Sequence, residues 1–326
     1  MFDSPMTSIL LPAREWTQAC AEVVAQLDHD DELFIICDAP TDPIASHPLF
    51  DAVSKTDEGP IVRLLIAGEP SGCSGKANAI ATGIEEASPD QDRFIWTDAD
   101  FVHGDDWLDR MKTLGERADS AVSGVPVFTS TGWAWRLYEP AAAMFGSLAI
   151  LAQDGAWGGS VTFTRDHLDL NAFVRDLRRT VSDDGLLWRY LDTENGGVGV
   201  TTRRDLVYEI PVEGTPRAVA NRLTRNNRIL HMTDPSGFRQ SLVASLVVLG
   251  AGVIAPLYVG TLATLLAGVT YWYLGVRRWT WLFAFPAMYI GLIGLICGVV
   301  REEFWWGDRK YRWRSKFDVE VLRSSD

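Results

Sequence analysis

The sequence predicts an α/β fold, with a doubly wound sheet followed by C-terminal transmembrane helices. Short apolar runs that end in turn-forming residues alternate with segments of helical spacing in the first part of the chain. Two long stretches near the C-terminus contain no charged side chain. Alternating strands and helices are typical of a parallel sheet covered on both faces, and uncharged stretches of about 20 residues match the width of a bilayer core.

The chain opens with a predicted β-α-β unit. Residues 7–11 form a short apolar run that ends at Pro12, and residues 32–37 form a second one that ends at Asp-Ala-Pro, 38–40. Between them, apolar residues recur at helical spacing over 16–27. Apolar runs of this length between turn formers are typical of buried parallel strands, and the spacing between them indicates a helix.

Two further predicted strands also end in polar or glycine-rich segments. A run at 61–67 precedes the glycine-rich segment 68–75, after which residues 76–87 have the pattern of a helix. A strand at 93–97 leads directly into Asp98-Ala99-Asp100. Ligands of open α/β sheets bind beyond the carboxyl ends of the strands, so we expect the functional site at this edge.

The pattern is weaker beyond these strands. Residues 121–128 predict another short strand. The segment 138–152 is apolar and almost uncharged, which is compatible with a core helix or with an interfacial helix resting on a membrane. Residues 176–190 predict one helical segment that contains Asp183 and Asp184.

The C-terminal third predicts membrane insertion. Residues 241–275 and 280–300 carry no charge, and the first stretch is long enough for a hairpin that turns near Pro256. Three spans is the simplest count. The sequence therefore predicts three regions: an α/β domain at 1–240, about three transmembrane helices at 241–300, and a basic and aromatic juxtamembrane tail at 301–326.

The placement of basic residues complicates this count. Arg277 and Arg278 lie between predicted spans, and a basic tail follows the last one. Because basic residues favour the cytoplasmic side, three complete spans would put the α/β domain and the tail on opposite faces. One segment is then expected to be re-entrant or interfacial, with four tail aromatics at the headgroups: Trp305, Trp306, Tyr311 and Trp313.

Charge and cysteine content narrow the possible functions. The chain has a net charge of −13, which is the sum of −16 in residues 1–240 and +3 in residues 241–326. A domain this acidic repels phosphates, which argues against a nucleic-acid partner. The four cysteines show no disulfide or metal-binding spacing, and the first residues lack the basic region and long apolar core of a signal peptide. We expect a multi-pass protein of the cell membrane with a reduced, cytoplasmic α/β domain.

The carboxylates of Asp98 and Asp100 are the strongest candidates for chemistry. Alternate residues at a strand end project in different directions, so one carboxylate is able to hold a ligand while the other coordinates a cation on its diphosphate. Hard oxygen ligands favour Mg²⁺ or Mn²⁺. The alternative is an Asp-x-Asp at an ordinary surface turn. Asp38, at the end of the second strand, is either a neighbouring ligand residue or a turn former before Pro40.

The segment 71–76 (SGCSGK) superficially resembles a nucleotide-binding P-loop. Pro70 stands where that loop needs glycine, and Ala77 stands where it needs serine or threonine, so the segment is not an NTPase loop. Lys76 still has two possible roles. It either reaches toward phosphates or is an ordinary lysine at a helix start.

Two pairs of charged residues later in the chain are further candidates for the functional site. Asp183 and Asp184 either include a general base or cap a helix N-terminus. Arg225 and Arg228, three residues apart, suit a diphosphate through the fork of each guanidinium. Five arginines before the membrane segments offer another explanation, contact with anionic headgroups: Arg217, Arg222, Arg225, Arg228 and Arg239.

In this order, the segments resemble the membrane-bound family 2 glycosyltransferases, especially the ceramide glucosyltransferase-like branch. The likeness extends over nearly the whole chain, and the ordered set is more specific than any single motif. The matching stretches are SILLPAREW, LFIICDAP, SGCSGKANAIATGI, FIWTDADF, TVSDDGLLWRYL, TRNNRIL and FWWGDRKYRW.

The resemblance implies a GT-A fold at 1–240 that binds a nucleotide-sugar, and a transfer that inverts the anomeric centre. Carried onto this chain, Pro12, Glu15 and Asp38 would surround the nucleotide base. Asp98 would bind the donor, and Asp100 would bind the metal with it, with Mg²⁺ or Mn²⁺ as the cofactor.

The family's Glu-Asp base motif corresponds to Asp183-Asp184, which implies Asp184 as the base. The register leaves Asp183 open, because Arg189 then aligns better. The family's Arg-x-x-Arg-Trp segment corresponds to Arg225 through Ile229, with Ile229 in place of the tryptophan of the acceptor platform.

This departure and the small number of spans favour a single transfer onto a lipid over polymer synthesis. A glycolipid headgroup or a polyprenyl phosphate would fit as acceptor. The rival readings are a catalytically silent membrane protein that binds nucleotide-sugars, a polysaccharide synthase, and a nucleotidyltransferase, for whose soluble product a membrane anchor has no purpose.

Overall fold

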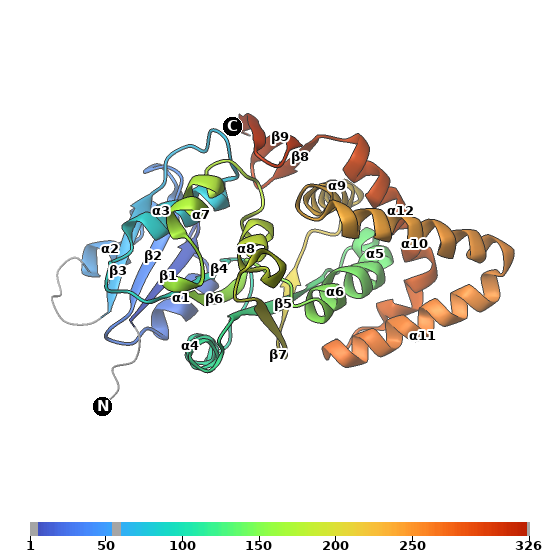
Figure 1. The fold of residues 1–326 in the computed structure, drawn as a ribbon, viewed down its shortest axis with the longest axis horizontal. Coiled ribbons are helices and arrows are strands. Elements are labelled where there is room, and N and C mark those ends of the chain that lie inside the picture. Colours follow the sequence, from blue (N-terminus) through green and yellow to red (C-terminus); the bar gives the residue numbers. More distant parts are fainter. Residues whose placement is uncertain (1–5, 54–59, 325–326) are drawn as a thin grey trace. The chain divides into compact units, whose positions relative to one another are not determined.

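The structure is a computed structural model that describes residues 6–53 and 60–324, and the chain forms two compact units (Figure 1). The first unit comprises the residues up to Gly124 together with Asp154–Tyr208 and Phe317–Val321. The second comprises Val125–Gln153, Glu209–Lys316 and the residues from Leu322 onward. The predicted α/β class is confirmed, and three apolar helices follow in the C-terminal part.

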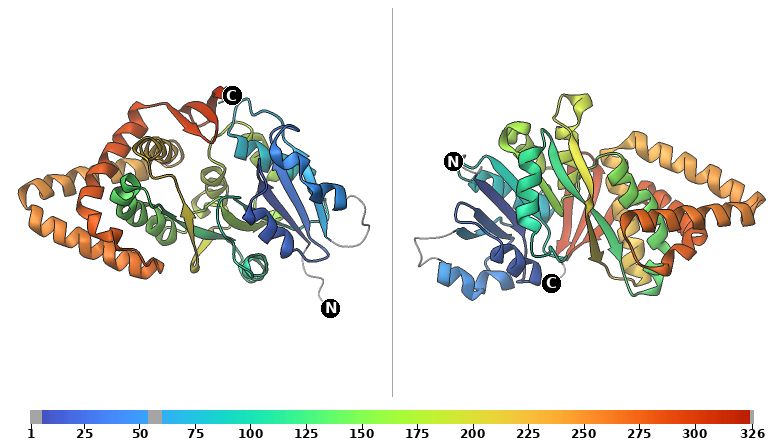
Figure 2. Two further views of the ribbon diagram at one scale, coloured as in Figure 1. Left: turned by 180° about the vertical axis from the view of Figure 1, so that it is seen from behind. Right: turned by 90° about the horizontal axis from the view of Figure 1, so that it is seen from below.

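A mixed seven-stranded sheet is the framework of the α/β part, in the order β3-β2-β1-β4-β6-β5-β7. Four strands run parallel, and β6 pairs antiparallel with both β4 and β5. The first strands lie side by side in Figure 2. The strands are β1 (Thr7–Pro12), β2 (Glu32–Cys37), β3 (Ile61–Ile66), β4 (Arg93–Thr97), β5 (Ala121–Thr129), β6 (Ser160–Thr164) and β7 (Val200–Pro211).

Helices pack on both faces of this sheet. Strand residues alternate between two buried clusters: Leu10 and Phe34 belong to one, while Ile9 and Leu33 belong to the other. This alternation follows from the two-residue period of a strand, and every residue of β2 is buried because both faces are covered. The helices are α1 (Gln18–Ala25), α2 (Pro48–Val53), α3 (Gly75–Glu86), α4 (Trp107–Arg117), α7 (Leu170–Leu177) and α8 (Asp183–Leu191), with 3₁₀ turns η1 (Pro43–Ser46), η3 (Arg165–His167) and η4 (Thr193–Asn195).

The predicted single helix over 176–190 is wrong. Helix α7 ends at Leu177, and α8 begins at Asp183. The new helix begins there because the Ser182 hydroxyl accepts a hydrogen bond from the backbone N–H of Gly185, which is the N-cap arrangement. The break places both aspartates in the first turn of α8.

The second unit is mainly helical. Residues 133–152 form one continuous helical segment with a π-helical turn in the middle, and its side chains range from buried Glu139 to Phe145, which is 64% exposed. The elements are α5 (Trp133–Ala142), η2 (Ala143–Ser147), α6 (Leu148–Ala152), α9 (Pro216–Thr233), α10 (Pro235–Ile254), α11 (Pro256–Leu274), η5 (Trp279–Phe283) and α12 (Ala284–Val300).

Three helical segments are long and apolar enough to cross a membrane: Pro235–Ile254, Pro256–Leu274 and Trp279–Val300. Helices α10 and α11 meet at one end like two arms of a hairpin (Figure 1). The turn lies at Ala255–Pro256, as the sequence predicts, because proline lacks the N–H that would continue α10.

The C-terminal tail forms strands β8 (Glu303–Trp306), β9 (Arg309–Ser315) and β10 (Asp318–Ser324), with β8 antiparallel to β9. Tyr311 and Trp313 are buried, so the expectation that they lie at lipid headgroups is wrong. Side chains on one face of a strand pack inward together, and these two residues share a face of β9. Trp305 and Trp306 are only partly buried.

Candidate active site

Three neighbouring strands end at the carboxyl edge of the sheet beside predicted site residues. Pro12 ends β1, Asp38 follows β2, and Asp98 follows β4, with β1 in the middle of the three. Strands β2 and β4 flank β1, and the chain leaves β1 toward β2 on one side but returns to β4 on the other. In α/β proteins, ligands bind in the crevice that such a reversal of strand order creates. The predicted location of the site at this edge agrees with the fold.

Lys76 lies at the centre of a charged cluster within the first unit. Its Nζ lies 2.6 Å from Asp98 Oδ1 and 3.1 Å from Asp183 Oδ2, and it donates a hydrogen bond of 2.8 Å to the carbonyl oxygen of Gly158. Lys76 occupies the first turn of α3, whose N-cap is Ser74. Three segments distant in sequence thus converge on the ammonium group of Lys76.

The cluster carries an excess of negative charge. Burial lowers the pKa of Lys76, but the carboxylates of Asp183, Asp98 and Asp184 raise it by more, so the lysine stays protonated. Burial raises the pKa of Asp98, Lys76 opposes this effect, and the charges of Asp100 and Asp183 add to it. One lysine therefore balances only part of the surrounding carboxylate charge, which favours binding of a further cation.

Asp183 and Asp184 have different surroundings. The side chain of Asp183 is only 1% exposed, and its Oδ2 makes no directional hydrogen bond beyond the ion pair with Lys76. Burial raises the pKa of Asp183, and Lys76 opposes the rise. Asp184 is half-buried, and its Oδ1 accepts hydrogen bonds from the Ser182 hydroxyl at 2.5 Å and the Gly185 N–H at 2.7 Å.

Asp100 is exposed beside Asp98, and it contributes to the raised pKa of that residue. Within 6–53 and 60–324, no three His, Cys, Asp or Glu side chains converge on a possible metal position. Mg²⁺ and Mn²⁺ need fewer protein ligands when a diphosphate supplies the others, commonly one or two carboxylates. The donor set at Asp98 and Asp100 therefore fits a divalent cation that binds together with a phosphorylated ligand.

Gly158 and Gly159 complete the cluster, and neither was predicted from the sequence. A Cβ atom on Gly158 would lie 2.3 Å from Asp183 Oδ2 and 3.0 Å from Lys76 Nζ. The Gly159 carbonyl accepts hydrogen bonds from the Asp98 N–H at 3.2 Å and the Thr97 hydroxyl at 2.7 Å. Paired glycines directly before a strand are a signal of close backbone approach, and this signal was available in the sequence.

Buried His103 is linked to the Gly158-Gly159 turn through Thr97. His103 Nε2 lies 2.6 Å from Thr97 Oγ1, and because that hydroxyl donates to Gly159, the histidine is the donor to Thr97. Burial lowers the pKa of His103 to about 4, despite the opposing charge of Glu22, so the ring is neutral at pH 7. His103 thus holds Thr97, which holds the glycine turn. His103 was not among the residues predicted from the sequence.

The residues predicted around a nucleotide base lie at the ends of β1 and β2. Asp38 is buried, and its Oδ2 lies 3.7 Å from Arg14 Nε. Asp42 shapes the turn, because its Oδ2 accepts hydrogen bonds from the N–H groups of Asp38 and Ala39, each at 2.9 Å. Glu15 is exposed, and Pro12 is half-buried.

An aromatic pair adjoins these residues. Trp16 stacks on His47 with ring centroids 3.8 Å apart and planes 2° from parallel. No local pattern in the sequence indicates this pair, since the two residues lie in separate connections.

The two predicted arginines belong to the second unit. Arg228 is buried, and its guanidinium donates to the carbonyl oxygen of Trp313 from two nitrogens, and to Gly298 and Val299 at 3.3 Å each. The guanidinium carbon of Arg225 lies 4.7 Å from the centroid of the Trp306 ring.

No family model matches the chain, and no curated protein matches its sequence. Among solved structures, the chain is similar to the mannosyltransferase PcManGT from Pyrobaculum calidifontis in complex with GDP-Man and Mn²⁺. The identity is 16%, the coverage is 90% of this chain and 88% of that one, and the TM-score is 0.47. It is also similar to glucosyl-3-phosphoglycerate synthase from Mycobacterium tuberculosis in complex with Mg²⁺ and UDP, with 14% identity, 69% and 77% coverage and a TM-score of 0.41. Because both scores lie below 0.5, the chemistry must be inferred from the geometry of the site.

Proposed function

We propose that this chain is a membrane-embedded glycosyltransferase of GT-A type, which transfers one sugar from a nucleotide-sugar to a lipid with inversion of the anomeric centre. The observation that carries the proposal is the position of Lys76 between Asp98 and Asp183 at the carboxyl edge of β1 and β4. A cation already held among surplus carboxylates suits a substrate that brings both phosphates and a metal ion.

The donor binds along the ends of the strands. In this proposal Pro12, Glu15 and Asp38 surround the nucleoside, and Asp98 contacts the donor. Lys76 turns its ammonium toward the diphosphate, where its charge counters that of the phosphate oxygens. This needs only a small movement of the side chain, because Lys76 lies in the first turn of α3 and its Nζ is already among the carboxylates.

Asp98 and Asp100 would hold the divalent cation. When bound, the cation supplies charge neutralisation to the departing nucleoside diphosphate. Lys76 orients Asp183 through their ion pair.

The base is one of the two aspartates at the start of α8, and Asp184 is the preferred candidate. An acceptor hydroxyl attacks the anomeric carbon, the bond from that carbon to the diphosphate oxygen breaks, and the hydroxyl proton passes to the carboxylate. The Oδ1 of Asp184 is held by Ser182 and Gly185, which leaves Oδ2 to receive the proton. Asp183 is more deeply buried and neutralised by Lys76.

We also propose that Arg225 contributes to binding of the leaving diphosphate. Arg228 has a different role in this proposal. Its guanidinium donates to three backbone carbonyls, so it stabilises the packing of α9 within the second unit.

The acceptor is proposed to be a membrane lipid, either a glycolipid or a polyprenyl phosphate. The support is the set of three apolar helical segments and the replacement of the family's tryptophan by Ile229. The α/β part at 1–240 is then cytoplasmic, and the protein is a multi-pass protein of the cell membrane.

Transfer from radiolabelled nucleotide-sugars to extracted lipids tests this function. The full chain is reconstituted in lipid nanodiscs with Mn²⁺, and the lipids are analysed by mass spectrometry. We expect one sugar added per lipid, whereas a polysaccharide synthase would give a ladder of products.

The variant Asp184→Asn tests the base. Removal of a general base typically lowers the rate by about 10²–10⁴-fold, with donor binding retained. Asp90→Asn is the matched control, because Asp90 is exposed and away from the charged cluster. If neither the wild-type chain nor the control transfers sugar while both bind the donor, the silent binding protein is the correct alternative.

A further inference from the structure

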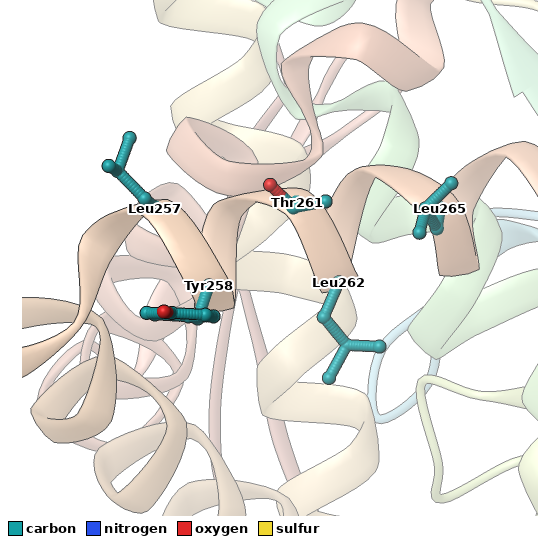
Figure 3. Close-up of a pocket in the computed structure, with 5 residues that line it drawn as sticks. All are labelled: Leu257, Tyr258, Thr261, Leu262 and Leu265. Carbon is teal, nitrogen blue, oxygen red and sulfur yellow. The ribbon is translucent and has the colours of Figure 1, made fainter.

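A shallow apolar groove lies on α11 in the second unit. It is lined by residues of that helix alone, Leu257, Tyr258, Thr261, Leu262 and Leu265 (Figure 3). No charged side chain lines it, so the groove has nothing to orient a sugar or a phosphate. The residues that surround the proposed metal-binding carboxylates lie instead in the first unit.

Asp100 is exposed, and its position depends on its two neighbours in the chain. In the part of the chain that the structure describes, no side chain bonds to its carboxylate. The carbonyl of Ala99 accepts a hydrogen bond of 2.9 Å from the Thr17 hydroxyl. On the other side, Phe101 is buried, with 4% of its surface exposed. A fixed residue on each side leaves the backbone of Asp100 little freedom.

Phe101 lies among three other aromatic rings. Its ring centroid is 4.3 Å from that of His103, 5.3 Å from that of Trp157 and 5.2 Å from that of Tyr208. Trp157 and Tyr208 also pack on each other, with centroids 6.0 Å apart. Aromatic pairs attract one another at separations of about 4.5–7 Å beyond the effect of burial alone. Phe101, Trp157 and Tyr208 therefore form a mutually packed aromatic trio.

Trp157 covers the glycine turn that follows it. A Cβ atom on Gly159 would overlap the indole ring of Trp157, so glycine is needed for this packing. The Gly159 carbonyl accepts the hydrogen bond from the Asp98 N–H. Trp157 is thus linked to Asp98 through the turn, while Phe101 is linked to Asp100 through the chain.

Tyr208 reaches the trio from β7, and Gly124 of β5 makes room for its ring. A Cβ atom on Gly124 would lie 2.8 Å from Tyr208 Cε2. Strands β5 and β7 are neighbours in the sheet, so this close approach is part of their pairing. The trio therefore joins three segments that are far apart in the sequence: the loop after β4, the turn before β6, and β7.

We propose that Phe101 and Trp157 are positioning residues that keep the carboxylates of Asp98 and Asp100 in place for a divalent cation. This role rests on the proposed function, in which both carboxylates bind the metal together with a diphosphate. Phe101 fixes the backbone of Asp100, and Trp157 fixes the turn that bonds to Asp98. Phe101 and Trp157 belong to neither of the two buried clusters on the faces of the sheet, so their packing is local to the loop and the turn.

Phe101→Leu tests this role, because leucine keeps the position apolar but removes the ring. The full chain in lipid nanodiscs is saturated with a nucleoside diphosphate chosen from ADP, CDP, GDP, UDP and dTDP. It is then titrated with Mn²⁺, and free Mn²⁺ is followed by electron paramagnetic resonance. Loss of a group that orients a metal ligand typically weakens metal binding about 10–100-fold, so we expect the Kd for Mn²⁺ to rise by about 10-fold or more. The metal-free affinity for the diphosphate should stay the same. An unchanged Kd for Mn²⁺ would overturn the proposal.

Phe94→Leu is the matched control. Phe94 is fully buried in β4 and stacks on Phe163 with centroids 5.5 Å apart, but it belongs to a buried cluster on one face of the sheet. We expect this variant to have a lower Tm and the wild-type affinity for Mn²⁺. If Phe94→Leu and Phe101→Leu raise the Kd for Mn²⁺ equally, general loosening of the fold explains the effect and the proposed role is wrong.

A second pair of variants covers the case in which Phe101→Leu does not fold. Tyr208 is half-buried on β7, which is an edge strand, so its replacement disturbs the fold less. Tyr208→Leu removes a ring that packs on both other members of the trio and should weaken Mn²⁺ binding about 10-fold. Tyr208→Phe keeps the ring and should keep the wild-type affinity. Equal Mn²⁺ affinity in these two variants, at any value, would contradict a role for the rings.

The wild-type chain separates failure of this role from failure of the proposed function. If none of the diphosphates tightens its binding of Mn²⁺, both the proposed function and the positioning role are wrong. If the diphosphate tightens Mn²⁺ binding equally in the wild-type chain, Phe101→Leu and Tyr208→Leu, only the positioning role is wrong.

Discussion

The two units each contain a buried carboxylate paired with a cation, but the two pairs have different surroundings. In the first unit, Lys76 faces Asp98 and Asp183, and Asp98 is 26% exposed. In the second, Glu139 has one cation, Arg278, and the hydroxyls of Tyr271 and Thr280 also donate to it. Surplus negative charge with access to solvent favours ligand binding, whereas a balanced and enclosed pair holds helices together.

The largest effect is expected for Lys76→Met. Loss of a charged group that acts on the diphosphate should lower kcat/KM for sugar transfer by about 10²–10³-fold. Lys76→Arg keeps the charge and should recover part of the activity. Steady-state kinetics with saturating lipid measures both. If Lys76→Met keeps wild-type kcat/KM, the cluster has no catalytic role.

In the second unit, Arg278→Met should act on stability instead. It leaves the buried Glu139 carboxylate without its cation, and broken buried pairs typically cost about 3–5 kcal/mol of unfolding free energy. Thermal unfolding in detergent should show a lower Tm than for Arg277→Met, whose side chain is exposed. The kcat of the folded fraction should be unchanged. A drop in kcat without a drop in Tm would contradict the assignment of the Glu139–Arg278 pair to stability.

The neutral His103 predicts a pH dependence of stability. Its folded-state pKa is about 4, below the ordinary 6.5, so the unfolded chain binds more protons between these values. The neutral His103 therefore contributes about 3 kcal/mol to the free energy of unfolding. This contribution is fully present above pH 6.5 and is lost as the pH falls toward 4. Urea unfolding at several pH values measures it. His103→Asn should flatten this part of the profile, and an unchanged slope in that variant would assign the effect to other groups.

A smaller effect is expected for Gly158→Ala. The added methyl group would displace Asp183 or Lys76, and we expect kcat to fall by about 10-fold, since a shift of this size costs roughly 1–2 kcal/mol. Gly250→Ala is the matched control, because a Cβ atom there meets nothing within 4 Å. Equal kinetics for the two variants would show that the glycine turn does not position the cluster.

The strands and their polar ends were predictable from the sequence because local pattern determines them. The predicted strands at 32–37 and 93–97 agree with β2 and β4 to the residue, since each is a fully buried apolar run closed by a turn. Asp98, Lys76 and Asp183 were predicted as candidates, but the contact of both carboxylates with Lys76 depends on long-range packing that no local pattern records.

Other features of the fold and the site could not be predicted, because they depend on residues that are far apart in the sequence or on single side chains. Strand β7 has mixed polar and apolar residues, RRD among them, and its pairing partner lies far away in sequence. The role of Gly158 depends on Asp183, 25 residues away, and the role of His103 depends on the hydroxyl of Thr97. The break before α8 required recognition of Ser182 as a cap within a continuous helical pattern.

The central claim is that carboxylates, a divalent cation and a sugar diphosphate meet at the carboxyl edge of the sheet. Donor binding measured with and without Mn²⁺ tests it most directly. Calorimetry of the full chain with a panel of nucleotide-sugars should show binding to at least one donor that tightens about 10-fold or more with Mn²⁺. Asp100→Asn should abolish the gain from Mn²⁺ while the metal-free affinity stays the same. Donor binding that ignores Mn²⁺, or a gain that persists in Asp100→Asn, would contradict the proposed site.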